Sequence, residues 1–303
     1  MKAEYSCDIQ EIFSKEQFEG KVQPNCPMSG YTTFKIGGAA KILINAACFC
    51  DIAKAIELSE KNGLPYFVMG NGSNLLVSDS GYDGVIIRLS SAFSEISADG
   101  CTVCAQAGAL LPQIANFALS KSLCGFEFAA GIPGSAGGAL VMNAGAYGGE
   151  MADIICGAKV LRCGKVVDLV PAELNLSYRH SALMNTNDIV LEVSYSLSEG
   201  DSSDIKARMD ELRIARSSKQ PLNLPSAGSA FKRPQGAFAA KLIDGCGLKG
   251  FSVGGAQVSP KHAGFIVNLG GATSADVTEL TDIVIEKVKS ETGYLLEREF
   301  IAL

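Results

Sequence analysis

The stretch that organises this sequence is Gly131-Ile-Pro-Gly-Ser-Ala-Gly-Gly-Ala-Leu-Val-Met-Asn-Ala-Gly-Ala-Tyr-Gly-Gly-Glu150. Seven of the chain's 33 glycines fall in it, although its inner run Ala139–Met142 is apolar. Glycine has no Cβ and tolerates positive φ, so its backbone N–H groups can lie directly against a phosphorylated ligand. A plain surface loop would be polar throughout, so we favour a nest of N–H groups that begins at the Pro133-Gly134 turn.

A second glycine-rich loop, Gly70-Asn-Gly-Ser-Asn-Leu75, follows the apolar run Tyr66–Met69, which predicts a buried strand. Leu75 stands where a dinucleotide fingerprint needs its third glycine, and strand-like residues follow instead of a helix. The loop is therefore no Rossmann motif, but its donors can still hold a pyrophosphate. Two such loops together predict one extended cofactor held between neighbouring subdomains.

The composition is that of a globular chain, with 303 residues, 47% hydrophobic and 19% charged, which is enough for two or three domains. No apolar run reaches the roughly 18 residues of a membrane helix, so we expect no membrane partner. Residues 1–20 carry five acidic side chains and no apolar core of the signal-peptide kind. We therefore expect a cytoplasmic protein.

The charge is unevenly distributed. The net charge of −6 argues against a nucleic-acid partner. Between Asp201 and Lys261, however, ten Lys and Arg stand against five Asp and Glu, so this segment should face an anion. An ordinary charged helix face near Arg208, Arg213 and Arg216 is the alternative.

Ten cysteines without a signal peptide are typical of reduced, mostly buried thiols. Two pairs are close in sequence, Cys101 with Cys104 and Cys48 with Cys50. Neither has the further Cys or His ligands of a zinc site, so we expect no metal.

Periodicity predicts the remaining elements. A helix follows the possible cap Asp51 and ends at Asn62-Gly63, and another is capped by Ser202 or Ser203. Residues 32–38 are expected to form a short strand followed by a glycine turn. The other expected elements are helices at about 110–122 and 275–290, the latter with a Thr273–Asp276 capping box, and strands at 41–44, 75–77, 85–89, 101–107, 158–162, 166–169, 189–197 and 294–301. Beyond Gly200 the pattern changes from expected strands to an expected helix, which indicates a domain boundary.

Five motifs follow one another along the chain: Thr32–Gly38, Gly70–Leu76, Gly131–Ser135 with Met142–Glu150, Pro225–Lys232, and Gly247–Gly250 with Gly254–Val258. In this order they resemble the motifs of the UDP-N-acetylenolpyruvoylglucosamine reductase family. The resemblance spans Thr32 to Glu299, and five ordered motifs are far more specific than any one of them.

This resemblance implies an α+β chain: a two-subdomain FAD-binding fold of the vanillyl-alcohol-oxidase (PCMH) type, followed by a C-terminal α/β substrate domain. The expected divisions are 1–85 and 86–200 for the two FAD-binding subdomains and 201–303 for the substrate domain. The implied activity is NADPH-dependent reduction of UDP-N-acetylglucosamine enolpyruvate to UDP-N-acetylmuramate in peptidoglycan precursor synthesis. The only histidines are His180 and His262, and neither lies in a flavin loop, so we expect FAD to be bound non-covalently. We also expect a monomer.

The family's motifs also imply catalytic residues. Ser229 matches the proton donor, Arg179 the residue that holds the substrate carboxylate and its developing enolate, and Glu299 the group that polarises or protonates that enolate. A serine is a weak acid, so a cation such as Lys232 or Lys219 must stabilise its alkoxide. Apart from the family, Ser229 would be a turn residue and Glu299 a surface residue, and Glu297 is the rival of Glu299.

Two further sets of site residues are expected, one for the cofactor and one for the substrate. The expected cofactor-binding residues are Gly70, Asn71, Gly72, Ser73, Asn74, Leu75, Gly131, Ile132, Pro133, Gly134, Ser135, Gly138, Asn143, Ala144 and Gly145. The expected substrate-binding residues are Tyr178, Arg213, Arg216, Lys219, Lys232, Lys261 and His262.

The sequence also departs from the family's pattern. Ile301 stands where a basic residue is usual, and Arg233 where Asn is frequent. No long tyrosine-bearing insertion follows Arg179, which resembles the shorter subclass. Two alternatives stay open: an FAD-dependent oxidase of the same fold, and a non-catalytic flavin- or nucleotide-sugar-binding protein in which Cys101 and Cys104 sense redox state.

Overall fold

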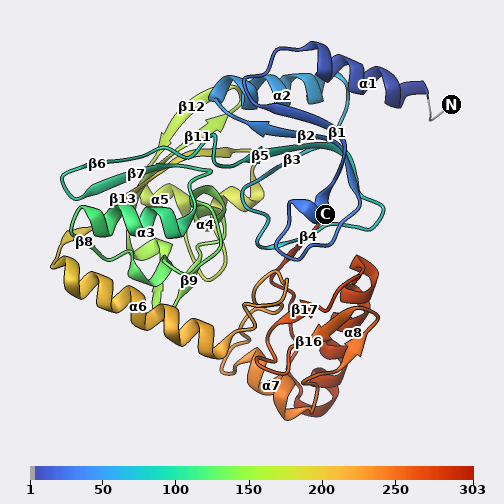
Figure 1. Ribbon diagram of the computed structural model, residues 1–303, viewed down its shortest axis with the longest axis vertical. Helices are drawn as coiled ribbons and strands as arrows, with labels where there is room; N and C mark the ends of the chain where they lie inside the picture. Colours follow the sequence, from blue (N-terminus) through green and yellow to red (C-terminus); the bar gives the residue numbers. More distant parts are fainter. Residues whose placement is uncertain (1–3) are drawn as a thin grey trace. The chain divides into compact units, whose positions relative to one another are not determined.

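The computed structural model describes the backbone of residues 4–303 and the side chains from residue 9 onward. The chain forms two compact units. Unit 1 comprises residues 1–24, 42–71 and 84–215, and unit 2 comprises residues 25–41, 72–83 and 216–303. The chain therefore passes between the units several times (Figure 1). These units follow spatial compactness, so the functional division at residues 85 and 200 stays a prediction.

Unit 1 is built on two sheets. The first has the strand order β1 (Lys21–Pro27), β2 (Ala39–Ala46), β5 (Tyr82–Leu89), β3 (Tyr66–Met69). The second is antiparallel, in the order β12 (Lys165–Leu169), β11 (Ile155–Arg162), β13 (Ile189–Ser196), β7 (Thr102–Gln106), β6 (Ile96–Asp99). Short pairs join β8 (Leu123–Cys124) to β14 (Ser198–Glu199) and β9 (Gly145–Ala146) to β10 (Gly149–Glu150).

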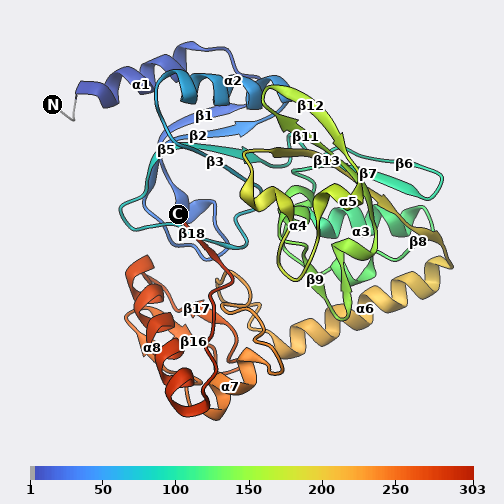
Figure 2. The same cartoon turned by 180° about the vertical axis from the view of Figure 1, so that it is seen from behind.

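Helices accompany both sheets of unit 1. The short helix α4 (Ala136–Val141) packs against β13 and β7, so the glycine-rich stretch lies on the five-stranded sheet (Figure 2). One apolar core continues from β2 and β5 into β7, β13 and α3. The other helices that begin in unit 1 are α1 (Glu4–Lys15), α2 (Phe49–Lys61), α3 (Leu111–Ser120), α5 (Pro171–Leu174) and α6 (Ser202–Lys219).

Unit 2 has a smaller core of its own. Its sheet has the order β15 (Ser252–Val253), β16 (Ala256–Val258), β17 (Ile266–Asn268), and the long helix α8 (Ser274–Thr292) packs on β15 and β16 (Figure 2). Apolar side chains of α7 (Ala239–Gly245) and α8 fill the space between the elements. The strands β4 (Leu75–Leu76) and β18 (Ile301–Ala302) pair in parallel, which joins the glycine-rich loop Gly70–Leu75 to the C-terminal residues.

Most of the expected helices and strands are confirmed within a few residues. The capping box of α8 is confirmed as well: Asp276 N–H donates to Thr273 Oγ1 at 3.0 Å, and Thr273 N–H donates to Asp276 Oδ2 at 3.0 Å. Such a box satisfies backbone donors that a helix N-terminus leaves unpaired.

Two of the predicted helix N-caps were wrong. Cys48 is the N-cap of α2, and the buried carboxylate of Asp51 instead accepts the backbone N–H groups of Glu19, Gly20 and Ala47 at 2.8–2.9 Å. At α6, Asp201 Oδ1 accepts the N–H of Ser203 at 2.7 Å, so the cap lies one position before the expected serines.

Two strands were also wrong. In place of the short strand expected before Gly37, residues 32–34 form a turn and Lys35 has φ 55°, which a strand does not accommodate. The strand expected at 294–301 shrinks to β18, and residues before it make only isolated bridges such as Phe231 with Arg298.

None of the helices in the described part of the chain combines the length and the apolar character needed to cross a bilayer. The described cysteines are free thiols, and no three His, Cys, Asp or Glu side chains from residue 9 onward gather as metal ligands. Cys104 Sγ lies 3.3 Å from Ser194 Oγ, whereas Cys101 packs against the core of unit 1. The two cysteines of this pair therefore have different neighbours.

Candidate active site

The glycine-rich loop Gly70–Leu75, called the cofactor loop below, begins immediately after β3. A Cβ at Gly70 would collide with the hydroxyl of Ser135, so only glycine fits this position without a shift of Ser135. One residue later, Asn71 Nδ2 donates to the carbonyl of Pro133 at 2.7 Å. The structure thus brings the start of the Gly70–Leu75 loop against the Gly131–Ser135 stretch, although sixty residues separate them in sequence.

Ser135 is the most informative residue of this contact. It is 2% exposed, and its Oγ is buried without a hydrogen-bond partner in the described part of the chain. A buried hydroxyl without a partner is unfavourable by about 1–3 kcal/mol, and native structures rarely leave one unsatisfied. The lone hydroxyl and the glycine cradle beside it fit a cofactor with phosphate oxygens.

The glycine-rich stretch is fixed to the start of α3. Leu111 N–H donates to the Gly134 carbonyl at 3.0 Å, and Ala136 N–H donates to Ala109 O at 2.8 Å. At Gly137 an added Cβ would lie 2.9 Å from the Ala107 Cβ, so this glycine permits the close approach of α4 to β7. Beside the loop, a cavity of about 100 Å³ is lined by Asn71, Arg88, Leu89, Ser90, Ser91, Gly108, Leu110 and Gln113. Sequence reasoning missed Arg88, because nothing local distinguishes it from any other strand residue.

Arg179 lies at the tip of a tight turn near the second half of the glycine-rich stretch. Ser177 and His180 exchange two backbone hydrogen bonds of 3.0 Å across the turn, and Arg179 has φ 53°. Left-handed backbone at a non-glycine residue is unfavourable and is often found at functional sites. Arg179 Nη2 donates to the Gly145 carbonyl at 3.3 Å, and its guanidinium lies 5.0 Å from the Tyr178 ring centre.

Asn143 anchors this turn. It is fully buried, its Nδ2 donates to the Ser177 carbonyl at 2.9 Å, and its Oδ1 accepts the N–H of Ala152 at 2.9 Å. The expected cofactor residue thus also supports the Arg179 turn. The structure brings the sequence-predicted residues Asn143, Gly145 and Arg179 together within unit 1.

Ser229 and Glu299 come from distant parts of the sequence and meet in unit 2. Ser229 follows Gly228, whose φ of 78° is left-handed, and it forms an isolated bridge with Phe265. Glu299 N–H donates to the Ala230 carbonyl at 2.9 Å, so the backbone of Glu299 lies directly beside the serine segment. The rival Glu297 is exposed and pairs with Lys232, with Nζ 3.3 Å from Oε2. The Glu297 carbonyl also accepts the Lys232 N–H at 2.9 Å, so the choice of Glu299 over Glu297 stays a prediction.

The predicted cations have varied partners. Lys261 Nζ donates to the Ser217 carbonyl near the end of α6 at 2.7 Å. Arg213 lies in unit 1 and pairs with Asp210 at 3.2 Å, while Arg216 and Lys219 belong to unit 2. Charge from the segment 201–261 is therefore shared between the two units.

His262 contributes no cation near neutral pH. Burial lowers its pKa, the Nδ1 atom accepts the Gly264 N–H at 3.2 Å, and its ring makes an edge contact with Phe265 at 5.0 Å. The expected role of His262 in substrate binding stays a prediction.

We expect His262→Asn to reduce the loss of stability in acid. Because the folded pKa is lowered, the unfolded chain binds the proton first, and the stability is complete above an unfolded pKa of about 6.5 and is lost as pH falls below it. Asn keeps an acceptor and does not titrate. Thermal unfolding at about pH 7.5 and about pH 5 should show a smaller fall in Tm for the variant, and an equal fall would contradict this assignment.

With this geometry established, the relatives of the chain can be compared. Residues 220–303 match the family model of the UDP-N-acetylenolpyruvoylglucosamine reductase C-terminal domain, and residues 40–169 match that of an FAD binding domain. UDP-N-acetylenolpyruvoylglucosamine reductase of Clostridium novyi is 44% identical over 96% of this chain and 94% of that protein. The chain belongs to this reductase family. The reductase of Alkaliphilus metalliredigens is 48% identical over 90% of each chain.

A solved reductase gives the same fold. The crystal structure of the Thermus caldophilus enzyme has a TM-score of 0.81 and 38% identity, and covers 94% of this chain and 99% of that one. The predicted fold of an FAD-binding part followed by a substrate domain is confirmed, as are the function in peptidoglycan precursor synthesis and the use of FAD and NADPH. Assignment to the shorter subclass stays a prediction.

Proposed function

We propose that this reductase adds two hydrogens to the enolpyruvyl ether of UDP-N-acetylglucosamine enolpyruvate, with Ser229, Arg179 and Glu299 as its catalytic residues. The observation that carries this proposal is the pairing of the Glu299 N–H with the Ala230 carbonyl, which puts the motif glutamate beside the motif serine. An oxidase of the same fold would give these side chains no common task.

Two groups of residues would hold FAD. The buried Ser135 hydroxyl and the Gly70 and Gly131–Gly134 backbone would contact the diphosphate, and Arg88 lies beside the same loop. When bound, FAD supplies hydride chemistry between NADPH and the terminal carbon of the enolpyruvyl group. The remaining expected cofactor residues are Asn71, Gly72, Ser73, Asn74, Leu75, Ile132, Gly138, Asn143, Ala144 and Gly145.

The protein must then deliver one proton to a substrate carbon and stabilise the negative charge of the enolate. Ser229 donates its proton to the carbon that carries the ether oxygen, and Lys232, three residues on, stabilises the resulting alkoxide, with Lys219 as the alternative cation. Arg179 binds the substrate carboxylate with its planar fork, over which the enolate charge spreads. Glu299 polarises the same enolate.

The rest of the substrate is a nucleotide diphosphate. Arg216 and Lys219 would bind the diphosphate, and Tyr178, Arg213, Lys261 and His262 would contact other parts of the nucleotide sugar. We further propose that the reductase acts as a monomer in the cytoplasm, with 1–85 and 86–200 serving FAD and 201–303 serving the substrate.

The experiment follows the product in the absence of oxygen. Purified protein with NADPH and UDP-N-acetylglucosamine enolpyruvate should yield a UDP-sugar heavier by two hydrogens, with one NADPH consumed for each product. NADPH consumption that requires oxygen and leaves the UDP-sugar unchanged would replace this proposal with the oxidase.

We expect Arg179→Lys to reduce kcat/KM for the enolpyruvyl substrate about 10- to 100-fold, since a lysine keeps the charge but loses a bidentate hydrogen bond to the carboxylate. The rate of flavin reduction by NADPH should change much less. Stopped-flow absorbance measures the two steps separately.

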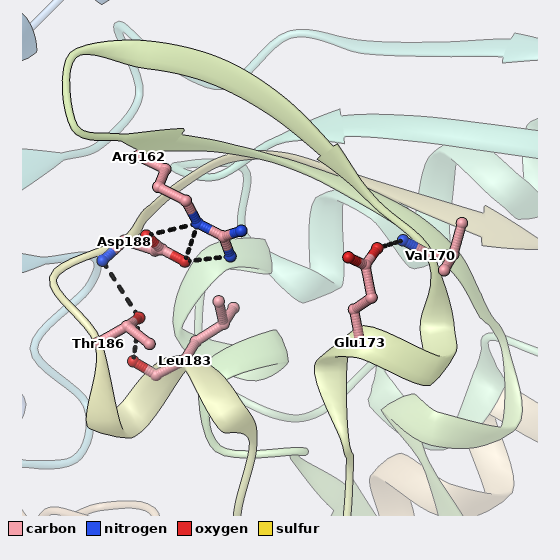
Figure 3. Close-up of polar contacts among 6 residues, drawn as sticks. All are labelled: Arg162, Val170, Glu173, Leu183, Thr186 and Asp188. Atoms are coloured by element: carbon pink, nitrogen blue, oxygen red, sulfur yellow. Dashed lines mark hydrogen bonds and ion pairs between the residues drawn. The ribbon is translucent and has the colours of Figure 1, made fainter.

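A matched control is Arg162→Lys. Figure 3 shows the Arg162 fork facing Asp188, with Nε and Nη2 donating to the carboxylate oxygens at 2.7–3.1 Å. This pair lies at the end of β11, and Thr186 Oγ1 also accepts the Asp188 N–H at 3.2 Å (Figure 3). The control should keep both rates. Equal kinetic effects of the two substitutions would show that loss of an arginine fork acts only through general stability.

A further inference from the structure

Thr33 forms hydrogen bonds with both the cofactor loop and the segment Pro225–Ser229, called the serine turn here. Its backbone N–H donates to the Gly72 carbonyl at 3.1 Å, and its Oγ1 donates to the Ser226 carbonyl at 2.7 Å. Ser226 is 193 residues away in sequence and only three before Ser229. One half-buried threonine thus contacts both loops, and all of these residues belong to unit 2.

Asn268 fixes the same turn from a second side. It is 5% exposed, its N–H donates to the Pro225 carbonyl at 2.9 Å, and its Nδ2 donates to the Phe34 carbonyl at 3.1 Å. The carbonyls of two consecutive turn residues, Pro225 and Ser226, are therefore both bound. After them the chain reverses at the left-handed Gly228 and reaches Ser229.

The cofactor loop also holds the segment that carries Glu299. Asn74 Nδ2 donates to the Glu299 carbonyl at 3.1 Å, and Asn74 O accepts the Ile301 N–H at 2.9 Å. Gly72 and Asn74 are two residues apart, so one short segment contacts the backbone of Glu299 directly and the backbone of Ser226 through Thr33. This segment reaches the surroundings of Ser229 by two routes: through Thr33 to the Ser226 carbonyl, and through Glu299, whose N–H donates to the Ala230 carbonyl.

We propose that Thr33 is a positioning residue for proton delivery, whose hydroxyl holds the serine turn so that the Ser229 hydroxyl keeps its direction. The proposal rests on the function proposed for Ser229. With Thr33→Val, the side chain keeps its shape but the Ser226 carbonyl loses this donor. A small displacement of a reacting group has large kinetic effects, and we expect product formation to slow about 10- to 100-fold.

The test measures each half-reaction in Thr33→Val holoenzyme by stopped-flow absorbance, with FAD content and Tm determined on the same preparation. Flavin reduction by NADPH and FAD content should match the wild type, whereas oxidation of the reduced flavin by the enolpyruvyl substrate should slow. Thr33→Ser retains the donor and should restore most of the rate.

Thr32→Val is the matched control. The neighbouring Thr32 is buried, whereas Thr33 is half-buried, and the Thr32 Oγ1 likewise donates one hydrogen bond, to the Ile36 carbonyl at 3.1 Å. Among the described hydrogen bonds, Thr32 has none to the serine turn. It should lower Tm without changing either half-reaction. If Thr33→Val only lowers Tm in the same way, the positioning role is overturned.

A double-mutant cycle separates this inference from the proposed function. If Thr33 acts through Ser229, then Thr33→Val should add almost no slowing in the Ser229→Ala background, because residues that act as a unit are not additive. Additive slowing would overturn the inference and leave the role of Ser229 intact. Normal turnover by Ser229→Ala itself would instead overturn the proposed function.

Discussion

Ser229→Ala is expected to slow the reaction of the reduced enzyme with the enolpyruvyl substrate by roughly 10²–10⁴-fold, the range typical of a lost general acid. Flavin reduction by NADPH should stay nearly unchanged, because that step delivers no proton to substrate carbon. Stopped-flow absorbance of the flavin, with each half-reaction started separately, gives the two rate constants.

Two variants control for the turn itself. Ser226→Ala removes a hydroxyl from the same turn but keeps the backbone carbonyl that accepts from Thr33, so both rates should persist. Ser229→Cys should recover part of the activity, since a thiol is more acidic than a hydroxyl. Equal slowing of both half-reactions by Ser229→Ala, or normal turnover, would make Ser229 a turn residue and leave Glu299 as the next candidate for the proton donor.

Gly70→Val is expected to remove most of the FAD. The new side chain would displace the Ser135 hydroxyl, and the hydrogen bond that we propose between this hydroxyl and the cofactor would be lost. Overpacking of about 1–3 kcal/mol and loss of a charge-assisted hydrogen bond of about 1.5–3 kcal/mol together predict a Kd for FAD raised about 10²- to 10⁴-fold. Titration of the apoprotein with FAD, followed by flavin fluorescence, measures this constant.

Gly157→Ala is the matched control in unit 1. The nearest atom to an added Cβ at Gly157 is the Leu169 carbonyl oxygen at 3.5 Å, an ordinary contact, so its FAD affinity should equal that of the wild type. Ser135→Ala should have an intermediate effect, because it removes the hydroxyl without a clash. Wild-type affinity in Gly70→Val would show that the cofactor lies elsewhere.

Local sequence signals predicted those elements whose ends are set by neighbouring residues. The capping box of α8 joins Thr273 to Asp276, three residues apart, and the end of α2 depends on Gly63, which is left-handed at φ 62°. Both were visible in the sequence, because capping and glycine termination depend on residues within one turn. The two glycine-rich loops were equally visible from composition.

Long-range contacts decide the features that the sequence did not reveal. Residues 32–38 have the composition of a strand, yet Thr33 and Phe34 bind Ser226 and Asn268, which lie about two hundred residues further on. Asp51 resembles a helix cap but binds the backbone of Glu19 and Gly20. No local pattern reports such partners, because tertiary packing overrides propensity.

The sequence predicted the side chains of the candidate site but not the residues that hold them in place. The resemblance to a family supplied Ser229, Arg179 and Glu299, while the Asn143 anchor and the Thr33 link came only from geometry. The Cys101/Cys104 spacing proved uninformative: Cys104 contacts Ser194 on the neighbouring strand, and Cys101 packs toward the core.

The most direct test of the reductase is an anaerobic titration of the purified yellow protein. One equivalent of NADPH should bleach the flavin, and one equivalent of UDP-N-acetylglucosamine enolpyruvate should then restore its visible absorbance completely while UDP-N-acetylmuramate forms. Bleached flavin that stays reduced with this substrate, but recovers rapidly in air, would contradict the account.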